Sequence, residues 1–305
     1  MFSRLRAYCI LVVATLAVAS CAKAPLSEQS PVSVELSLRL GATKSGASDG
    51  TQCAATRIVA EAYVAGKGIL AGHFEKSIQA GTLHTSITMD LVPSQEFDLV
   101  FWADCGEEYY DASSLRKVTQ AGGSHRGNDY ALDAFCACLK GVLPEDLVEE
   151  VVVLRRPLAQ INFVATDVLD QKLYNVPLDG YAPKEIEVKY STPVPVAYDV
   201  LESKGVDMQT VSWSAPVLEY DPAGSEALLA VDYLFVETAE KTLVDIGSFT
   251  ATLVEGDKVA SSDITNVPYQ RNYRTFIRGE FLSNSDRSRW NVSIEPGWTG
   301  ETEKL

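Results

Sequence analysis

The stretch Val32–Leu40, which reads VSVELSLRL, alternates apolar and polar side chains without a miss. Valine or leucine stands at every even-numbered position, and serine, glutamate or arginine stands at every odd one. Successive side chains of a β-strand point to opposite faces of a sheet, so a period of two predicts a strand with one buried face. An amphipathic helix would instead need apolar residues three and four positions apart.

The same alternation returns along most of the chain. It is found in the ranges 58–64, 87–91, 97–103, 186–190, 229–235 and 249–253. Prolines and glycines separate these short runs, and no helical period alternates with them. The pattern therefore predicts an all-β protein with minor helix, in which sheets pack face to face as β-sandwiches.

The length of 305 residues is more than one small core usually holds, which favours two domains. At the centre of the chain Pro157 follows an apolar run, and a proline cannot donate to a sheet ladder. We therefore expect an N-terminal β-sandwich over residues 32–156 and a C-terminal one over 157–305. Within the first, residues 41–56 are rich in Gly, Ser, Ala and Thr and are predicted to form a flexible loop.

Residues 1–20 have the form of a signal peptide. Two arginines precede an apolar run over residues 7–18, which is shorter than the about 20 residues that a membrane-spanning helix needs. Residues 16–21, LAVASC, resemble the bacterial lipobox, in which the cysteine carries the lipid. We therefore expect lipidation of Cys21, palmitate included, followed by a tether over residues 21–31. The alternative is ordinary secretion with cleavage near Ala19, which leaves the cysteine as a plain thiol.

The chain is acidic, with a formal net charge of -15 at pH 7 that becomes -17 when the signal's two arginines are removed. Nucleic acids and anionic lipids bind through clusters of Lys and Arg that displace counterions or meet headgroups. The absence of a basic cluster argues against both as partners. The negative charge serves mainly solubility.

Four cysteines remain once Cys9 leaves with the signal and Cys21 takes the lipid. They are Cys53, Cys105, Cys136 and Cys138. In an oxidising compartment they can pair in three ways, and we expect at least one disulfide. Cys136 and Cys138 lie two residues apart, so on one strand they face the same side and do not easily bond each other. A metal site is the alternative, but no second ligand pair at zinc-like spacing accompanies them.

No motif indicates catalysis. The three histidines, His73, His84 and His125, are scattered, and neither a nucleophile elbow nor a phosphate-binding loop occurs. We therefore expect no enzymatic activity, no metal and no cofactor. A sugar-binding platform could be built from Phe101, Trp102, Tyr109, Tyr110, Trp213, Trp290 and Trp298. The alternative is that these rings fill the core, as most aromatic side chains of sandwiches do.

Three stretches resemble the fimbrillin-like lipoproteins of Bacteroidales. They are FDLVFWAD at 97–104, LRRPLAQINF at 154–163 and VPYQRNYRT at 267–275. Within that group the chain resembles most a widespread domain of unknown function. The resemblance implies two tandem transthyretin-like β-sandwich domains and a lipid-anchored place on the outer membrane and cell surface. It also implies a structural or adhesive role, with other fimbrial subunits and a host or bacterial surface ligand as partners.

For the members that build pili, the resemblance further implies assembly by strand exchange. A trypsin-like protease cuts after a basic residue, the first strand leaves, and a strand of the next subunit pairs in its place, which is β-augmentation. In this sequence the candidate exchangeable strand carries Val32, Val34, Leu36, Leu38 and Leu40, and the candidate cleavage sites are Arg39, Lys44 and Arg57. The alternative is a monomeric surface lipoprotein that keeps this strand and binds a glycan or a protein.

Overall fold

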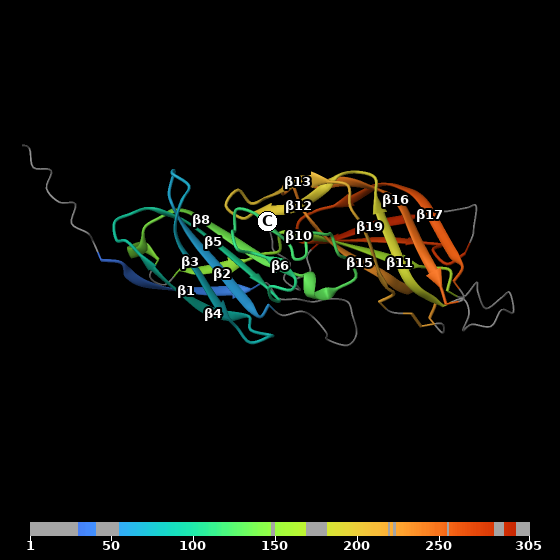
Figure 1. Ribbon diagram of the computed structural model, residues 1–305, viewed down its shortest axis with the longest axis horizontal. Helices are drawn as coiled ribbons and strands as arrows, with labels where there is room; N and C mark the ends of the chain where they lie inside the picture. The colour runs from blue at the N-terminus through green and yellow to red at the C-terminus, as the bar shows by residue number, and fades with distance from the viewer. Residues whose placement is uncertain are drawn as a thin grey trace, which may run out of the picture. The chain divides into compact units, whose positions relative to one another are not determined.

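A computed structural model describes residues 30–40, 55–147, 150–168, 182–218, 220–221, 224–254, 256–283 and 290–296. Strands dominate these ranges, in which the helical elements are short 3-10 turns at Tyr130–Leu132 and Pro144–Asp146 (Figure 1). The prediction of an all-β protein with minor helix is confirmed. No helix within the described ranges is long and apolar enough to cross a membrane. Cys21, Lys44, Cys53 and Trp298 lie outside the described residues.

The strands follow one another at short intervals along the chain. The earlier ones are β1 (Val32–Leu40), β2 (Arg57–Val64), β3 (Ile69–Ser77), β4 (His84–Leu91), β5 (Phe97–Asp104), β6 (Tyr110–Asp111), β7 (Val118–Gln120), β8 (Phe135–Val142) and β9 (Val151–Leu154). The later ones are β10 (Leu158–Ala165), β11 (Pro183–Tyr190), β12 (Val194–Asp199), β13 (Lys204–Gln209), β14 (Ser212–Pro216), β15 (Ala227–Phe235), β16 (Thr242–Leu253), β17 (Lys258–Tyr269), β18 (Tyr273–Gly279) and β19 (Asn291–Pro296).

The first sandwich is built from the sheets β4-β1-β9 and β3-β2-β5-β8. Their inner faces meet in a first core, to which β1 contributes Leu36 and Leu38, and β4 and β5 contribute Ile87 and Phe101. The alternation along β1 is the predicted one, since its even-numbered residues from Val34 onward are buried and its odd-numbered ones are exposed. Each large aliphatic side chain buried in this way stabilises the fold by about 2 kcal/mol.

The second sandwich is built from the sheets β14-β11-β16-β17 and β15-β10-β18-β19. Its core contains a ring cluster in which Phe249 lies 4.9 Å from Phe163 and 4.4 Å from Phe281, measured between ring centroids. Rings at these separations attract one another beyond the effect of burial. Two face-to-face sheet pairs, as the sequence predicts, therefore make up most of the described chain.

A third core lies beside a smaller sheet with the strand order β13-β12-β7-β6. Trp102 stands at its centre, with ring centroids 5.4 Å from Tyr110, 6.4 Å from Tyr198 and 6.4 Å from Phe235. These residues come from both sides of residue 156. The domain boundary at this residue therefore stays a prediction, because strands before and after it share a core.

The chain passes from one sandwich to the other between β9 and β10, where Arg156 is only 2% exposed. Its guanidinium forms two hydrogen bonds with the Asp133 carboxylate, of 2.7 and 2.8 Å, and lies 4.7 Å from the centroid of the Phe135 ring. A paired charge of this kind is tolerated in a buried position because both partners are satisfied. The crossing is thus fixed by an ion pair where Pro157 interrupts the ladder.

Candidate functional site

The candidate exchangeable strand, β1, is the central strand of its sheet. It pairs antiparallel with β4 along its length, from Val32 opposite Leu91 to Arg39 opposite His84. On the other side it pairs with β9 in parallel, but only over residues 37–40. Among the described residues, the first half of β1 is therefore held from one side and the second half from both.

Four of the five apolar side chains predicted for the exchangeable strand enter the first core. They are Val34, Leu36, Leu38 and Leu40, which are 8%, 0%, 1% and 5% exposed. Val32 departs from the prediction, since it is 42% exposed at the end of the strand. The outward residues are polar, and the Ser33 hydroxyl donates a hydrogen bond of 2.5 Å to Asp90. The strand thus fills a groove between β4 and β9 with one face and meets water with the other.

The candidate cleavage site Arg57 is the first residue of β2 and is buried, with an exposure of 8%. Its guanidinium donates hydrogen bonds of 2.9 and 2.8 Å to the two carboxylate oxygens of Asp104, and one of 3.0 Å to the Tyr110 carbonyl. A trypsin-like protease must insert this side chain into its own pocket. In the folded chain Arg57 is therefore inaccessible, and the sequence had no means to show it.

The candidate site Arg39 is exposed on the outer face of β1, but its backbone pairs with His84 on β4 and with Val153 on β9. The next residue donates a backbone hydrogen bond of 2.9 Å to Leu83. A protease needs an extended substrate without such partners, so cutting at Arg39 requires the end of the strand to open. The third candidate, Lys44, lies outside the described residues.

The cysteines divide into two kinds. Cys105 is disulfide-bonded, whereas Cys136 and Cys138 are free thiols on β8. The prediction that Cys136 and Cys138 are candidates for a disulfide is therefore corrected. The two side chains lie on one face of the strand, opposite Trp102 and Val100 of β5, and pack against the third core. Burial raises the pKa of Cys136 to about 12 and that of Cys138 to about 11. Both are thus thiols, which are poor nucleophiles and poor metal ligands, at neutral pH.

The described rings of the aromatic platform suggested by the sequence do not form one, since most of them are in the cores. Phe101, Trp102 and Tyr110 are fully buried. Trp213 is 5% exposed and donates its indole N–H to Asp232 over 2.8 Å. Tyr109 and Trp290 are partly buried and pack against the third and second cores.

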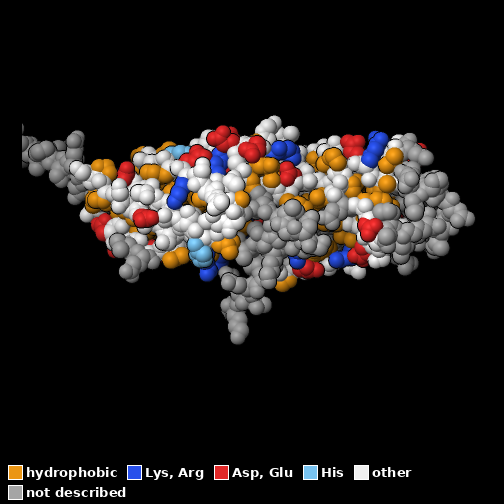
Figure 2. Space-filling model, turned by 90° about the horizontal axis from the view of Figure 1, so that it is seen from below, with side chains coloured by type: hydrophobic (Ala, Val, Ile, Leu, Met, Phe, Trp, Pro, Cys, Tyr) orange, Lys and Arg blue, Asp and Glu red, His pale blue; other side chains and the backbone are white. Residues whose placement is uncertain are grey.

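The three histidines are separated, as the sequence indicates. His73 contacts the buried Glu61 at 3.0 Å, His125 contacts Asp232 at 2.8 Å, and His84 is exposed beside Arg39. Within the described ranges no group of three or more His, Cys, Asp or Glu side chains could hold a metal ion. On the face drawn in Figure 2, acidic and basic side chains are interspersed with small apolar areas.

The feature that the sequence did not reveal is a pocket of about 340 Å³ beside β7 and β13, which His125 and Gln209 help to line. Its residues come from distant parts of the chain, so no local motif marks it. Part of the lining, Gly123 and Ser124, belongs to a turn after β7 that is rich in Gly and Ser, and this composition is the one feature of the sequence that points to the pocket.

A family model matches residues 27–304, which is nearly the whole chain. It describes a family of unknown function (DUF6562). The chain belongs to this family. When this sequence was compared with curated proteins, no match was found.

Several solved structures are similar to this member of DUF6562. One is a proposed cell adhesion protein from Parabacteroides distasonis, with 11% identity, a TM-score of 0.49, and coverage of 89% of this chain and 98% of the other. Another is the tip fimbrial protein Mfa3 from Porphyromonas gingivalis, with 12% identity, a TM-score of 0.45, and coverage of 85% and 99%. The fimbrial anchor protein Mfa2 of the same organism has 11% identity, a TM-score of 0.43, and coverage of 87% and 98%. Fimbrial proteins are thus among its structural neighbours.

Proposed function

We propose that the chain is a cell-surface structural lipoprotein, anchored by lipid on Cys21, that assembles with further subunits by exchanging β1. The placement of β1 carries the proposal: the first strand of the described residues fills a groove between two other strands. Two of the similar proteins are named as fimbrial proteins, and as part of the proposal we extend this role to the present chain.

The chemistry of the exchange lies in the groove. When β1 leaves, backbone N–H and C=O groups of β4 lose their partners along the strand, and those of β9 lose theirs over four residues. At the same time the first core opens to water where Leu36 and Leu38 lay. An incoming strand with the same alternation satisfies the backbone groups and refills the apolar sites at once, which is the basis of β-augmentation.

The cut that frees β1 falls before Arg57 in this proposal, after Arg39 or Lys44. Arg57 itself is held by Asp104 and is buried, which anchors the start of β2 when the first strand departs. A cut after Lys44 releases the whole of β1. A cut after Arg39 leaves Leu40, a core residue, on the subunit.

Limited trypsin digestion tests the exchange. The compact unit is Pro31–Leu305, so a chain that begins at residue 22 retains all of it. We expect an early cut after Arg39 or Lys44 and none after Arg57, as read by N-terminal sequencing. Mild urea then releases the strand. Once the urea and the released strand have been removed, size-exclusion chromatography should show oligomers.

A synthetic peptide of residues 31–40 provides the control. Added during strand release, it should occupy the groove and keep the product monomeric, whereas the same peptide with Leu36→Asp should not. If the cut product stays monomeric without any peptide, the proposal fails, and the chain is a stand-alone surface lipoprotein. Equal oligomerisation with both peptides would show non-specific aggregation and would also contradict it.

The lipid anchor is tested separately through Cys21. Expressed with its signal in a bacterium that processes lipoproteins, the full chain should partition with membranes, and the mature N-terminus should carry acyl chains by mass spectrometry. The Cys21→Ala chain should lose both properties, because the lipid has no other attachment point. An unmodified N-terminus on the parent chain would refute the anchor without affecting strand exchange.

A further inference from the structure

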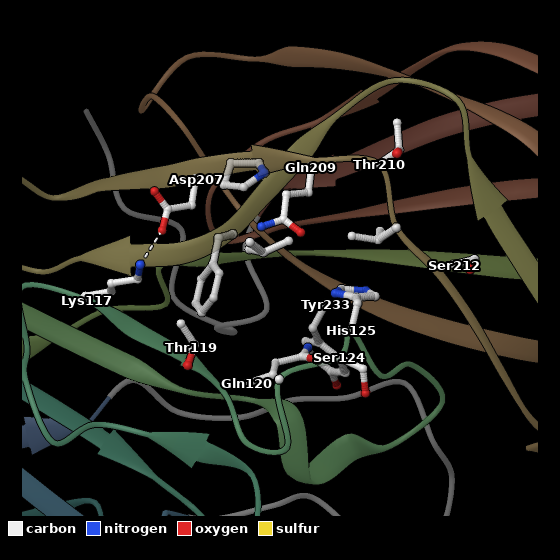
Figure 3. Close-up of a pocket in the computed structure, with 15 residues that line it drawn as sticks. Lys117, Thr119, Gln120, Ser124, His125, Asp207, Gln209, Thr210, Ser212 and Tyr233 are labelled. Carbon is white, nitrogen blue, oxygen red and sulfur yellow. Dashed lines mark ion pairs between the residues drawn. The ribbon is translucent and has the colours of Figure 1, made fainter.

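The pocket noted above lies where β13 and the turn after β7 approach β15 (Figure 3). Thr119 of β7 and Gln209 of β13 form part of its wall. Tyr233 and Phe235 of β15 also line it, and each is only 4% exposed. The pocket thus has mainly polar walls, to which the nearly buried Tyr233 and Phe235 side chains add only a small apolar area. None of these residues belongs to the β1 groove.

The charges in the pocket cancel. Lys117 and Asp207 lie at its edge and form an ion pair of 2.7 Å, marked by the dashed line in Figure 3. Apart from His125, the other residues that line the pocket carry no formal charge. A ligand with a net charge would find no unpaired counterion among the lining residues, so the electrostatics favour a neutral one.

Part of the lining is held rigid by hydrogen bonds. The Gln120 side chain accepts a bond of 2.6 Å from the Arg126 backbone N–H and donates one of 3.3 Å to its carbonyl, which closes the turn between them. His125, at the end of this turn, bonds through Nε2 to the buried Asp232 over 2.8 Å. Asp232 also accepts from the Trp213 indole over 2.8 Å, so one buried side chain holds both rings in place.

The remaining polar groups of the lining are uncommitted. The side chains of Thr119, Ser124, Gln209, Thr210 and Ser212 have no hydrogen-bond partner in the part of the chain that the structure describes. Figure 3 shows the Gln209 amide and the His125 ring on opposite sides of the same space. Hydroxyl and amide groups both donate and accept hydrogen bonds, so they match a ligand that presents the same mixture.

We propose that this pocket binds a neutral, hydroxyl-rich ligand, namely a terminal sugar of a glycan. A sugar presents hydroxyls that can pair with these uncommitted amide and hydroxyl groups. The volume of about 340 Å³ is at the lower end for ligand pockets, which suits one or two sugar units. This inference adds a ligand to the surface role proposed above. Binding of the sugar does not depend on strand exchange.

The test uses the uncut chain beginning at residue 22, with β1 in place. Saturation-transfer NMR against glucose, galactose, mannose, fucose, N-acetylglucosamine and N-acetylgalactosamine should detect binding of at least one neutral sugar in the millimolar range. Glucuronate and glucosamine, which carry a negative and a positive charge, serve as comparators. Both should bind more weakly than the best neutral sugar.

Two variants locate the binding. Gln209→Ala removes an exposed amide, and Thr119→Val removes a hydroxyl at nearly constant shape, so neither should disturb folding. Each should weaken binding by about fivefold or more, the factor expected for one lost hydrogen bond. Gln79→Ala, at an exposed turn between β3 and β4, is the matched control and should bind like the parent chain.

Three results would overturn the proposal. The first is that no neutral sugar binds, and the second is that a charged comparator binds tighter than all of them. The third is that both pocket variants bind as well as Gln79→Ala, which would place the site elsewhere. Because β1 is neither cut nor released in this test, its failure leaves the strand-exchange proposal untouched, and the reverse also holds.

Discussion

A chain with Leu36→Asp should lose its first sandwich at neutral pH. Leu36 is fully buried in the middle of β1, opposite Ile87 of β4. The substitution forfeits about 2 kcal/mol of apolar burial. The buried aspartate avoids carrying a charge only by staying protonated at pH 7. Because the ordinary pKa of an aspartate is about 3.9, keeping the proton at this pH costs about 4 kcal/mol more. The sum reaches the range of about 5–15 kcal/mol that holds a whole domain together.

The neighbouring substitution Ser37→Asp is the matched control. It introduces the same carboxylate one residue later, but residue 37 faces solvent, so the free energy of unfolding should change by less than about 0.5 kcal/mol. Urea unfolding followed by circular dichroism and by tryptophan fluorescence measures both variants. Equal unfolding midpoints would mean that β1 does not belong to the folded core, which would also remove the basis of the exchange proposal.

Local periodicity was sufficient to predict that the chain is all-β, because most of the strands have at least one face in a core. It did not show how many faces are buried. Along β15 the residues Val231, Tyr233 and Phe235 enter the third core, while Ala230 and Leu234 on the other face enter the second. A strand buried on both sides loses the clean alternation of apolar and polar residues. The third core, which depends on such strands, was therefore not visible in the sequence.

The candidate site was predicted unevenly for the same reason. The inward set of β1 follows from its alternation, and only the terminal Val32 departs from it. The accessibility of Arg57 depends on Asp104, and the burial of Trp213 depends on Asp232. Such partners are distant in sequence, so composition and spacing treat a buried arginine and an exposed one alike. The pocket beside β7 was missed because it has no contiguous motif.

The second large effect is expected for Asp232→Ala. Asp232 is fully buried on β15 and accepts four hydrogen bonds, of 2.7 to 2.8 Å, from the Tyr190 hydroxyl, the Trp213 indole, the His125 ring and the Tyr233 backbone. The alanine leaves these donors without an acceptor inside the protein. Each buried donor left unsatisfied costs about 1–3 kcal/mol, so we expect a loss of about 4 kcal/mol or more in the free energy of unfolding.

Asp257→Ala is the control for this prediction, because it removes an exposed carboxylate that has no hydrogen-bonding partner among the described residues. Its urea midpoint should match that of the parent chain. Asp232→Asn keeps the size of the side chain but replaces one acceptor oxygen with a donor that faces other donors, so it should recover only part of the stability. Full recovery in Asp232→Asn would show that the carboxylate charge and its second acceptor are unnecessary.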